Sequence, residues 1–187
     1  MTGAGGNLLR KALVVLGVAV SWAVLFHLNA VLFAHLEHSN RAHWIFLPAA
    51  LRVLSVLLFQ GAGAGGLMLG AFFTLPHHGL ASLVTDLLIS ASSAIAPLVS
   101  VVICRRWIGI AADLSGLRGL HIVAVSVLSA AANALGLNIA LAAAGQYKGD
   151  VEQVATVFVG DMLGSAIVLA LISLALSAFT RHAARRA

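Results

Sequence analysis

Long apolar runs separated by short polar loops dominate the sequence. The runs cover roughly residues 11–35, 44–59, 66–76, 80–104, 118–144 and 153–179. A helix needs about 20 apolar residues to cross the hydrocarbon core of a bilayer. Only 9% of the 187 residues are charged, whereas soluble domains carry about 25%. We therefore predict an all-α, polytopic membrane helix bundle with about six transmembrane segments, which forms a single integral membrane domain over residues 1–187.

The second and third segments are unusual because each is shorter than a typical membrane span. Pro48 lies in the first turn of the second segment, where its missing N–H costs little. A glycine-rich run over residues 61–66 separates the two segments. Two arrangements fit: a tight hairpin of two short helices, or a re-entrant pair. Irregular backbone at membrane depth needs protein or water around it, so either arrangement should pack inside the bundle.

The basic residues are distributed unevenly between the two sides of the membrane. Cytoplasmic loops carry an excess of Lys and Arg. With the N-terminus inside, only Arg41 and Lys148 fall on the outer side. The inner side then holds Arg10, Lys11, Arg105, Arg106, Arg118, Arg181, Arg185 and Arg186. We therefore predict that both termini are cytoplasmic, and that the net charge of +5 reflects this bias and not nucleic-acid binding.

Three ionisable side chains lie within the apolar segments: Arg52, Asp86 and Asp161. Placing an Arg or Asp at a helix centre costs about 2.5–3.5 kcal/mol, so each is expected to find a partner. From the order of the segments we expect Arg52 to face Asp161, with Asp86 nearby. Such a centre is either a structural ion pair that fixes how the helices dock, or a site for a polar ligand, an ion or a proton.

Small and polar residues repeat on single helix faces. One face of residues 80–104 carries Asp86, Ser90, Ser93 and Pro97, and one face of residues 118–144 carries Ser126, Ser129 and Asn133. We predict that six glycines allow close helix packing: Gly61, Gly63, Gly66, Gly70, Gly160 and Gly164. The string Gly61-x-Gly63-x-x-Gly66 matches a dinucleotide fingerprint, but no strand precedes it, so we reject nucleotide binding.

Few residues suggest catalysis or metal binding. Five histidines are expected near the outer face with Glu37: His35, His38, His43, His77 and His78. Imidazoles bind zinc, copper or nickel, but this spacing matches no known metal motif, and we favour interfacial histidines without a metal. The lone Cys104 excludes an internal disulfide. No nucleophile–base pair or phosphate-binding loop is found, so we expect no enzymatic activity and no cofactor.

Several short motifs resemble one family. They are Trp44-Ile-Phe-Leu-Pro-Ala-Ala-Leu-Arg52, the glycine run with Leu69-Gly70-Ala71, the entry Leu117-Arg118-Gly119, and Gly160-Asp161-Met162-Leu163-Gly164. In order and spacing they resemble the first-described family of membrane-associated sensor domains, found at the N-terminus of bacterial histidine kinases and diguanylate cyclases. The similarity extends over most of residues 40–175. Family members usually have more spans and usually continue into a signalling domain, so we expect a short, stand-alone member.

The resemblance implies a sensor-type module of the bacterial inner membrane that binds a small ligand or a partner membrane protein. Its partners would then be the bilayer and a second membrane protein or further copies of itself. One alternative is the substrate-binding subunit of an energy-coupling-factor transporter, whose size, helix count and glycine-rich packing are similar. A second alternative is a structural subunit of a membrane complex that binds no ligand.

Overall fold

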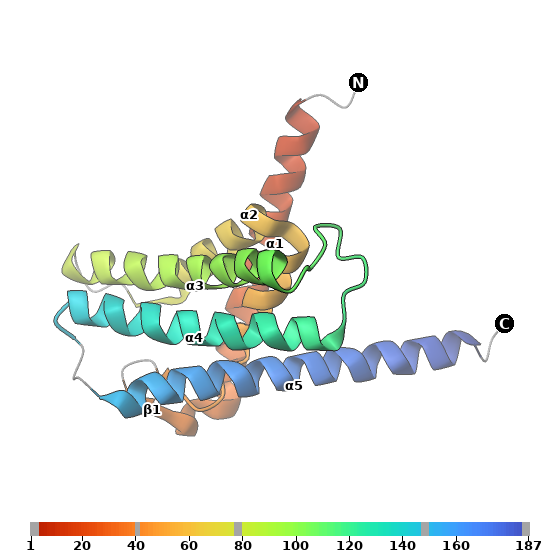
Figure 1. Ribbon diagram of the computed structural model, residues 1–187. Helices are drawn as coiled ribbons and strands as arrows, with labels where there is room; N and C mark the ends of the chain where they lie inside the picture. The colour runs from red at the N-terminus through yellow and green to blue at the C-terminus, as the bar shows by residue number, and fades with distance from the viewer. Residues whose placement is uncertain (1–3, 40–41, 77–79, 147–149, 185–187) are drawn as a thin grey trace.

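The computed structural model describes residues 4–39, 42–76, 80–146 and 150–184 (Figure 1). Within these ranges the chain forms five helices: α1 (Ala4–Phe33), α2 (Pro48–Thr74), α3 (Leu80–Trp107), α4 (Gly119–Ala143) and α5 (Val151–Ala184). By length and composition, each would be long and apolar enough to cross a membrane as a straight helix. The predicted all-helical fold is thus confirmed, and it is consistent with a multi-pass membrane protein.

Helices α3, α4 and α5 lie side by side with alternating directions, and α1 crosses them at a steep angle (Figure 1). Helix α2 lies between α1 and α3 and also contacts α4 and α5. The first turns of α1 and the last turns of α5 extend away from the rest of the bundle (Figure 1). These two ends therefore bury little of their apolar surface within the chain.

The prediction of six segments is wrong, because the described residues form five helices. The difference lies in α2 (Pro48–Thr74), which includes most of both short segments predicted at 44–59 and 66–76. Within α2 only Gln60 departs from helical backbone angles, with φ 52° and ψ −126°. The glycine run 61–66 is helical and not an irregular linker. The helix is therefore interrupted at a single residue, which directly precedes the glycine run.

Helix α2 folds back on itself at Gln60. A side chain on Gly63 would collide with the backbone carbonyl of Ser55, whereas a straight helix would separate these positions by more than two turns. Both ends of α2 also reach the same part of α1. The N–H of Leu47 donates to Asn29 Oδ1 at 2.9 Å, and Trp22 Nε1 donates to Thr74 Oγ1 at 3.1 Å.

We call residues 48–59 the first arm of α2, and residues 61–74 its second arm. At 1.5 Å per residue each arm is about 20 Å long, shorter than the roughly 30 Å hydrocarbon core. The end of the bundle at Gln60 is called the turn end, and the opposite end is called the strand end. Both arms therefore have one end at the strand end, where α2 begins and finishes.

The second arm packs closely on α1 through two glycines. A Cβ on Gly66 would lie 2.6 Å from Val18 Cβ, and a Cβ on Gly70 would lie 2.8 Å from Trp22 Cβ. Such distances are too short for any side chain larger than hydrogen. These glycines bring α1 against α2, and they set the position of the Trp22 side chain.

A short hairpin replaces the polar loop expected after the first helix. A 3-10 turn (Ala34–Leu36) leads into β1 (Glu37–Ser39), which pairs antiparallel with β2 (Ala42–His43). Ala42 is fully buried and packs in a small cluster with α3, α4 and α5. The hairpin thus closes the strand end of the bundle.

Candidate ligand site

A cavity of about 310 Å³ lies at the strand end of the bundle. All five helices and the hairpin contribute to its wall. The exposed residues Ala30, Glu37 and Pro76 belong to its lining, which places the opening beside the hairpin. Most of the wall is apolar or aromatic, and it includes Trp22, Phe26, Phe46, Ile89, Leu137 and Val157.

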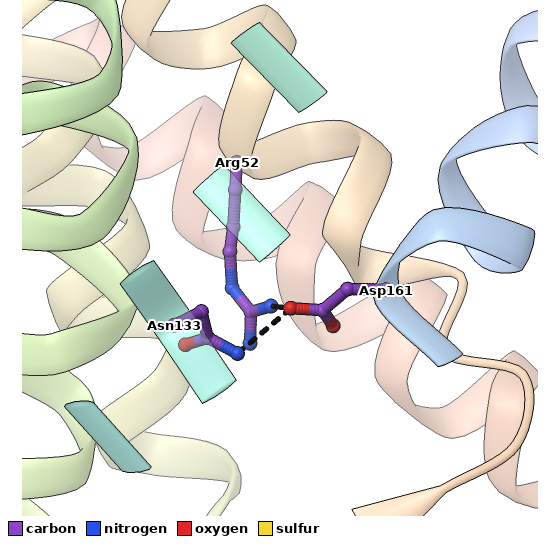
Figure 2. Close-up of polar contacts among 3 residues, drawn as sticks. All are labelled: Arg52, Asn133 and Asp161. Carbon is purple, nitrogen blue, oxygen red and sulfur yellow. Dashed lines mark hydrogen bonds and ion pairs between the residues drawn. The ribbon is translucent and has the colours of Figure 1, made fainter. Parts of the chain in front are cut away.

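A buried ion pair lies in the wall of this cavity. Arg52 Nη1 donates to Asp161 Oδ2 at 2.6 Å, and Asn133 Nδ2 donates to the same oxygen at 2.8 Å (Figure 2). The side chains of Arg52 and Asp161 are only 6% and 5% exposed. Residues from α2, α4 and α5 therefore meet at one carboxylate. The charge of each partner is offset by the other, as burial in an apolar bundle requires.

Two aromatic rings cover the guanidinium group of Arg52. Its Cζ atom lies 5.2 Å from the ring centroid of Trp22 and 5.1 Å from that of Phe46. The two rings meet edge to face, with centroids 5.9 Å apart. Cations at such distances are attracted to the faces of aromatic rings, most strongly when water is excluded. The rings therefore hold Arg52 in place and also give the cavity an aromatic wall.

Close contact between α5 and the segment before α2 positions the ion pair. Side chains at Gly160 and Gly164 would collide with the backbone carbonyls of His43 and Phe46. The N–H of Phe46 also donates to the carbonyl of Gly160 at 3.0 Å. Because Asp161 lies between these glycines, this contact brings its carboxylate beside the first arm of α2.

The three residues keep unused hydrogen-bonding capacity. Both hydrogen bonds to the carboxylate end on Oδ2, and Oδ1 of Asp161 points away from Arg52 and Asn133 (Figure 2). Nε of Arg52 is buried and has no hydrogen-bond partner among the described residues. The cluster is therefore held together by fewer bonds than its atoms can make.

Asp86 does not join this cluster as predicted. It is fully buried in α3, but among the described residues of α3 only Ile89 and Ser93 line the cavity. The hydroxyl of Ser90 donates to the backbone carbonyl of Asp86 at 2.6 Å. Asp86 shares a face of α3 with Ile89 and Ser93 and precedes Ile89 by about one helical turn. Its position along the helix, and not a different face, therefore separates it from the cavity.

The predicted packing glycines differ in their surroundings. Gly63, Gly66, Gly70, Gly160 and Gly164 each face backbone or a side chain too close for a Cβ atom. Gly61 is the exception, since no atom of the described residues lies within 4 Å of its Cβ position. Gly61 begins the second arm at the exposed turn, and the packing role predicted for it is wrong.

The candidate metal ligands do not form a site in the described part of the chain. No group of three or more His, Cys, Asp or Glu side chains there lies close enough to hold a metal ion. His77, His78 and the side chain of His38 lie outside the described residues. His35 is exposed in the 3-10 turn, and His43 is half-buried in β2.

His43 forms part of the cavity wall near the opening. Its ring stacks on Phe46 with centroids 5.8 Å apart and an angle of 18°. Burial lowers the pKa of His43 below its ordinary value, and the carboxylate of Glu37 opposes that change. His43 is therefore mostly neutral near pH 7, and Glu37 supplies the charge at the opening.

Three of the site's residues were not assigned to it by sequence reasoning. Asn133 was placed on a polar face with Ser126 and Ser129, but periodicity does not say which helix that face meets. Trp22 and Phe46 look like ordinary residues of an apolar segment. The one available signal was the need of Arg52 for partners within the membrane.

Comparisons of the chain with models of known protein families, with curated proteins and with solved structures found no match.

Proposed function

We propose that the protein is a sensor-type membrane module that binds a small ligand in the cavity at the strand end. The observation that carries this proposal is the Arg52–Asp161–Asn133 cluster in the wall of an otherwise apolar cavity of about 310 Å³. Small-molecule sites in proteins are typically concave and mostly apolar, with a few convergent polar groups, and measure about 300–1,000 Å³. The cavity has each of these properties.

The wall indicates the chemistry of the ligand. Its apolar and aromatic surface suits a compact apolar or aromatic body. Oδ1 of Asp161 can accept a hydrogen bond that neither Arg52 nor Asn133 supplies. We therefore propose a small molecule with an apolar body and a polar group that carries at least one N–H or O–H donor.

A purely structural ion pair is the competing interpretation. Apolar side chains of similar volume often stabilise a buried contact as well as an ion pair does, so helix docking alone does not require charges. Ionisable residues within membrane segments are rare and commonly mark ligand or ion sites. Both points favour a ligand-binding role for Arg52 and Asp161.

We further propose that the module lies in a bacterial inner membrane with both termini in the cytoplasm. The fold-back of α2 supports this orientation, because it returns the chain to the side from which α2 began. Helix α3 begins at Leu80, shortly after α2 finishes at the strand end, and its 28 residues carry Arg105 and Arg106 in the last turn to the opposite end. Arg10 and Lys11 also lie near Gln60. These four charges then share the cytoplasmic side, as the positive-inside bias favours.

Native mass spectrometry after mild detergent extraction tests the ligand site. We expect wild-type protein to carry a small-molecule mass that Ser93→Leu abolishes, because Ser93 lines the cavity and a leucine would fill it. Ser177→Leu makes the same change on the exposed part of α5 and should keep the bound mass. Equal occupancy in Ser93→Leu and wild type, with both proteins folded, would contradict the proposal.

A substrate-binding subunit of an energy-coupling-factor-type transporter is the second candidate. It is favoured by the surface of α5, where residues 171–179 are all exposed, because a coupling protein in the membrane could cover this apolar stretch. Copurification of an ATPase and a coupling subunit would favour the transporter. If the protein purifies without such subunits but with a bound small molecule, the sensor-type module is favoured.

A further inference from the structure

A second cleft, of about 620 Å³, lies at the turn end, far along α1 from the ligand cavity. Helix α1 and the turn of α2 form its walls. On α1, Asn7, Arg10, Lys11 and Val14 follow each other at helical spacing and share one face. The cleft is therefore a groove between the start of α1 and the tip of the α2 hairpin.

The wall of this cleft changes from polar to apolar along α1. Asn7, Arg10, Lys11 and Gln60 form its polar part, whereas Val14, Val15, Leu58 and Phe59 form its apolar part. Leu58 and Phe59 are 57% and 44% exposed, so they offer apolar surface that the chain itself leaves uncovered. A phospholipid in a bilayer changes in the same direction, because its polar headgroup lies at the membrane surface and its acyl chains lie in the hydrocarbon core that the helix enters.

The charge of the cleft is positive. None of its described lining residues is acidic, while Arg10 and Lys11 each carry a positive charge. The first acidic residue of the sequence is Glu37, which lines the cavity at the other end of the bundle. Basic pockets between membrane helices on the cytoplasmic side bind the headgroups of anionic lipids.

We propose that this cleft binds an anionic phospholipid. The phosphate group is held by Arg10 and Lys11, and the acyl chains lie along Val15 and the exposed side chains of Leu58 and Phe59. The apolar part of the wall favours a lipid over free phosphate, which would leave that surface in water. A bound lipid would also hold the tip of the α2 hairpin against α1.

Titration of the purified full-length protein with phosphatidylglycerol or phosphatidylcholine, followed by native mass spectrometry, tests this site. We expect phosphatidylglycerol to bind more tightly. Each basic residue near a membrane surface strengthens anionic lipid binding about 5-fold, so Arg10→Gln with Lys11→Gln should weaken it by roughly 30-fold. The control pair Arg106→Gln and Arg118→Gln removes the same charge from exposed positions that do not line the cleft, and it should change binding little.

Three results would overturn the lipid site. They are equal affinity for the two lipids, an equal loss in the control pair, and binding of glycerol 3-phosphate as tight as that of phosphatidylglycerol. Should the double variant fail to fold, Lys11→Gln alone is expected to weaken binding about 5-fold. Unchanged binding in a folded Lys11→Gln protein would also count against the site.

Discussion

The first arm of α2 carries Arg52 to the wall of the cavity at the strand end, whereas the second arm carries no charged residue and packs Gly66 and Gly70 on α1. Arg52 needs partners from α4 and α5, because its charge must be offset inside an apolar bundle. Gly66 and Gly70 need only the absence of a side chain. The comparison shows that the first arm supplies the charged group of the site, whereas the second arm sets how closely Trp22 approaches that group.

Removing the charge from the first arm should have the largest effect on stability. Arg52→Ala leaves Asp161 buried without its cation, and breaking such a pair typically costs about 3–5 kcal/mol. Replacing both partners, as in Arg52→Met with Asp161→Leu, should cost far less, because no buried charge remains. The free energy of unfolding in mixed micelles measures both variants. If the double variant is as unstable as Arg52→Ala, the pair is required for the fold.

Adding one methyl group to the second arm should have the next largest effect on stability. A Cβ on Gly66 would lie 2.6 Å from Val18 Cβ and 2.7 Å from the Val15 carbonyl oxygen. Overpacking of this kind costs about 1–3 kcal/mol, so Gly66→Ala should lower the free energy of unfolding by that amount.

Gly65→Ala is the matched control, since its Cβ would lie at an ordinary 3.7 Å from a methyl group of Val15. Alanine favours a helix by about 1 kcal/mol over glycine, so this variant should be at least as stable as the wild type. Similar losses in Gly65→Ala and Gly66→Ala would show that close approach to α1 is not what Gly66 provides.

Substitution of Gln60, the residue that joins the two arms, should increase stability and not decrease it. Gln60 has φ 52° and ψ −126°, a backbone conformation that glycine adopts far more easily than any other residue. Gln60→Gly should therefore raise the free energy of unfolding by about 1 kcal/mol. Gln60→Ala keeps the Cβ atom and should give no such gain. A loss of stability in Gln60→Gly would mean that the side chain of Gln60 contributes more than its backbone strain costs.

The smallest effect on stability is expected from a change of pH, which acts through His43 at the opening of the cavity. Burial lowers the pKa of His43 in the folded chain, while in the unfolded chain the pKa is near 6.5. Below about pH 6.5 the unfolded chain therefore binds this proton more readily, and stability falls until the lower folded pKa is reached.

Thermal unfolding at pH 7.5 and pH 5.5 measures this contribution. The fall in melting temperature between the two pH values should be smaller in His43→Phe than in wild type. The exposed His35 gives the control, and His35→Phe should keep the full pH dependence. An equal fall in wild type and His43→Phe would show that burial of His43 does not couple to folding.

Sequence reasoning predicted much of the fold because membrane helices are apolar throughout their length. It also paired Arg52 with Asp161, since both need a partner inside the bundle. It placed Asp86 in the same cluster, but the residues of α3 that line the cavity are Ile89 and Ser93, which lie about one and two turns further along the same face. A helical period identifies residues that share a face, yet it does not say which neighbour that face meets.

The shape of α2 could be predicted only in part. The short lengths of the two arms and the glycine run indicated a hairpin or a re-entrant pair, but they suggested a break within the glycines. The structure bends at Gln60 and keeps residues 61–66 helical, and within this run Gly63 contacts Ser55 and Gly66 contacts α1. Glycine in a membrane helix can serve flexibility or close packing, and its spacing alone does not distinguish them.

The most direct test of ligand binding at the ion pair is the occupancy of the cavity in the Arg52→Met, Asp161→Leu double variant. Native mass spectrometry would compare it with wild-type protein extracted under the same conditions. We expect wild type to carry a bound small molecule, and the folded double variant to have lost it. Retention of the same mass at wild-type occupancy in the double variant, or its absence from both proteins, would contradict a ligand site at Arg52 and Asp161.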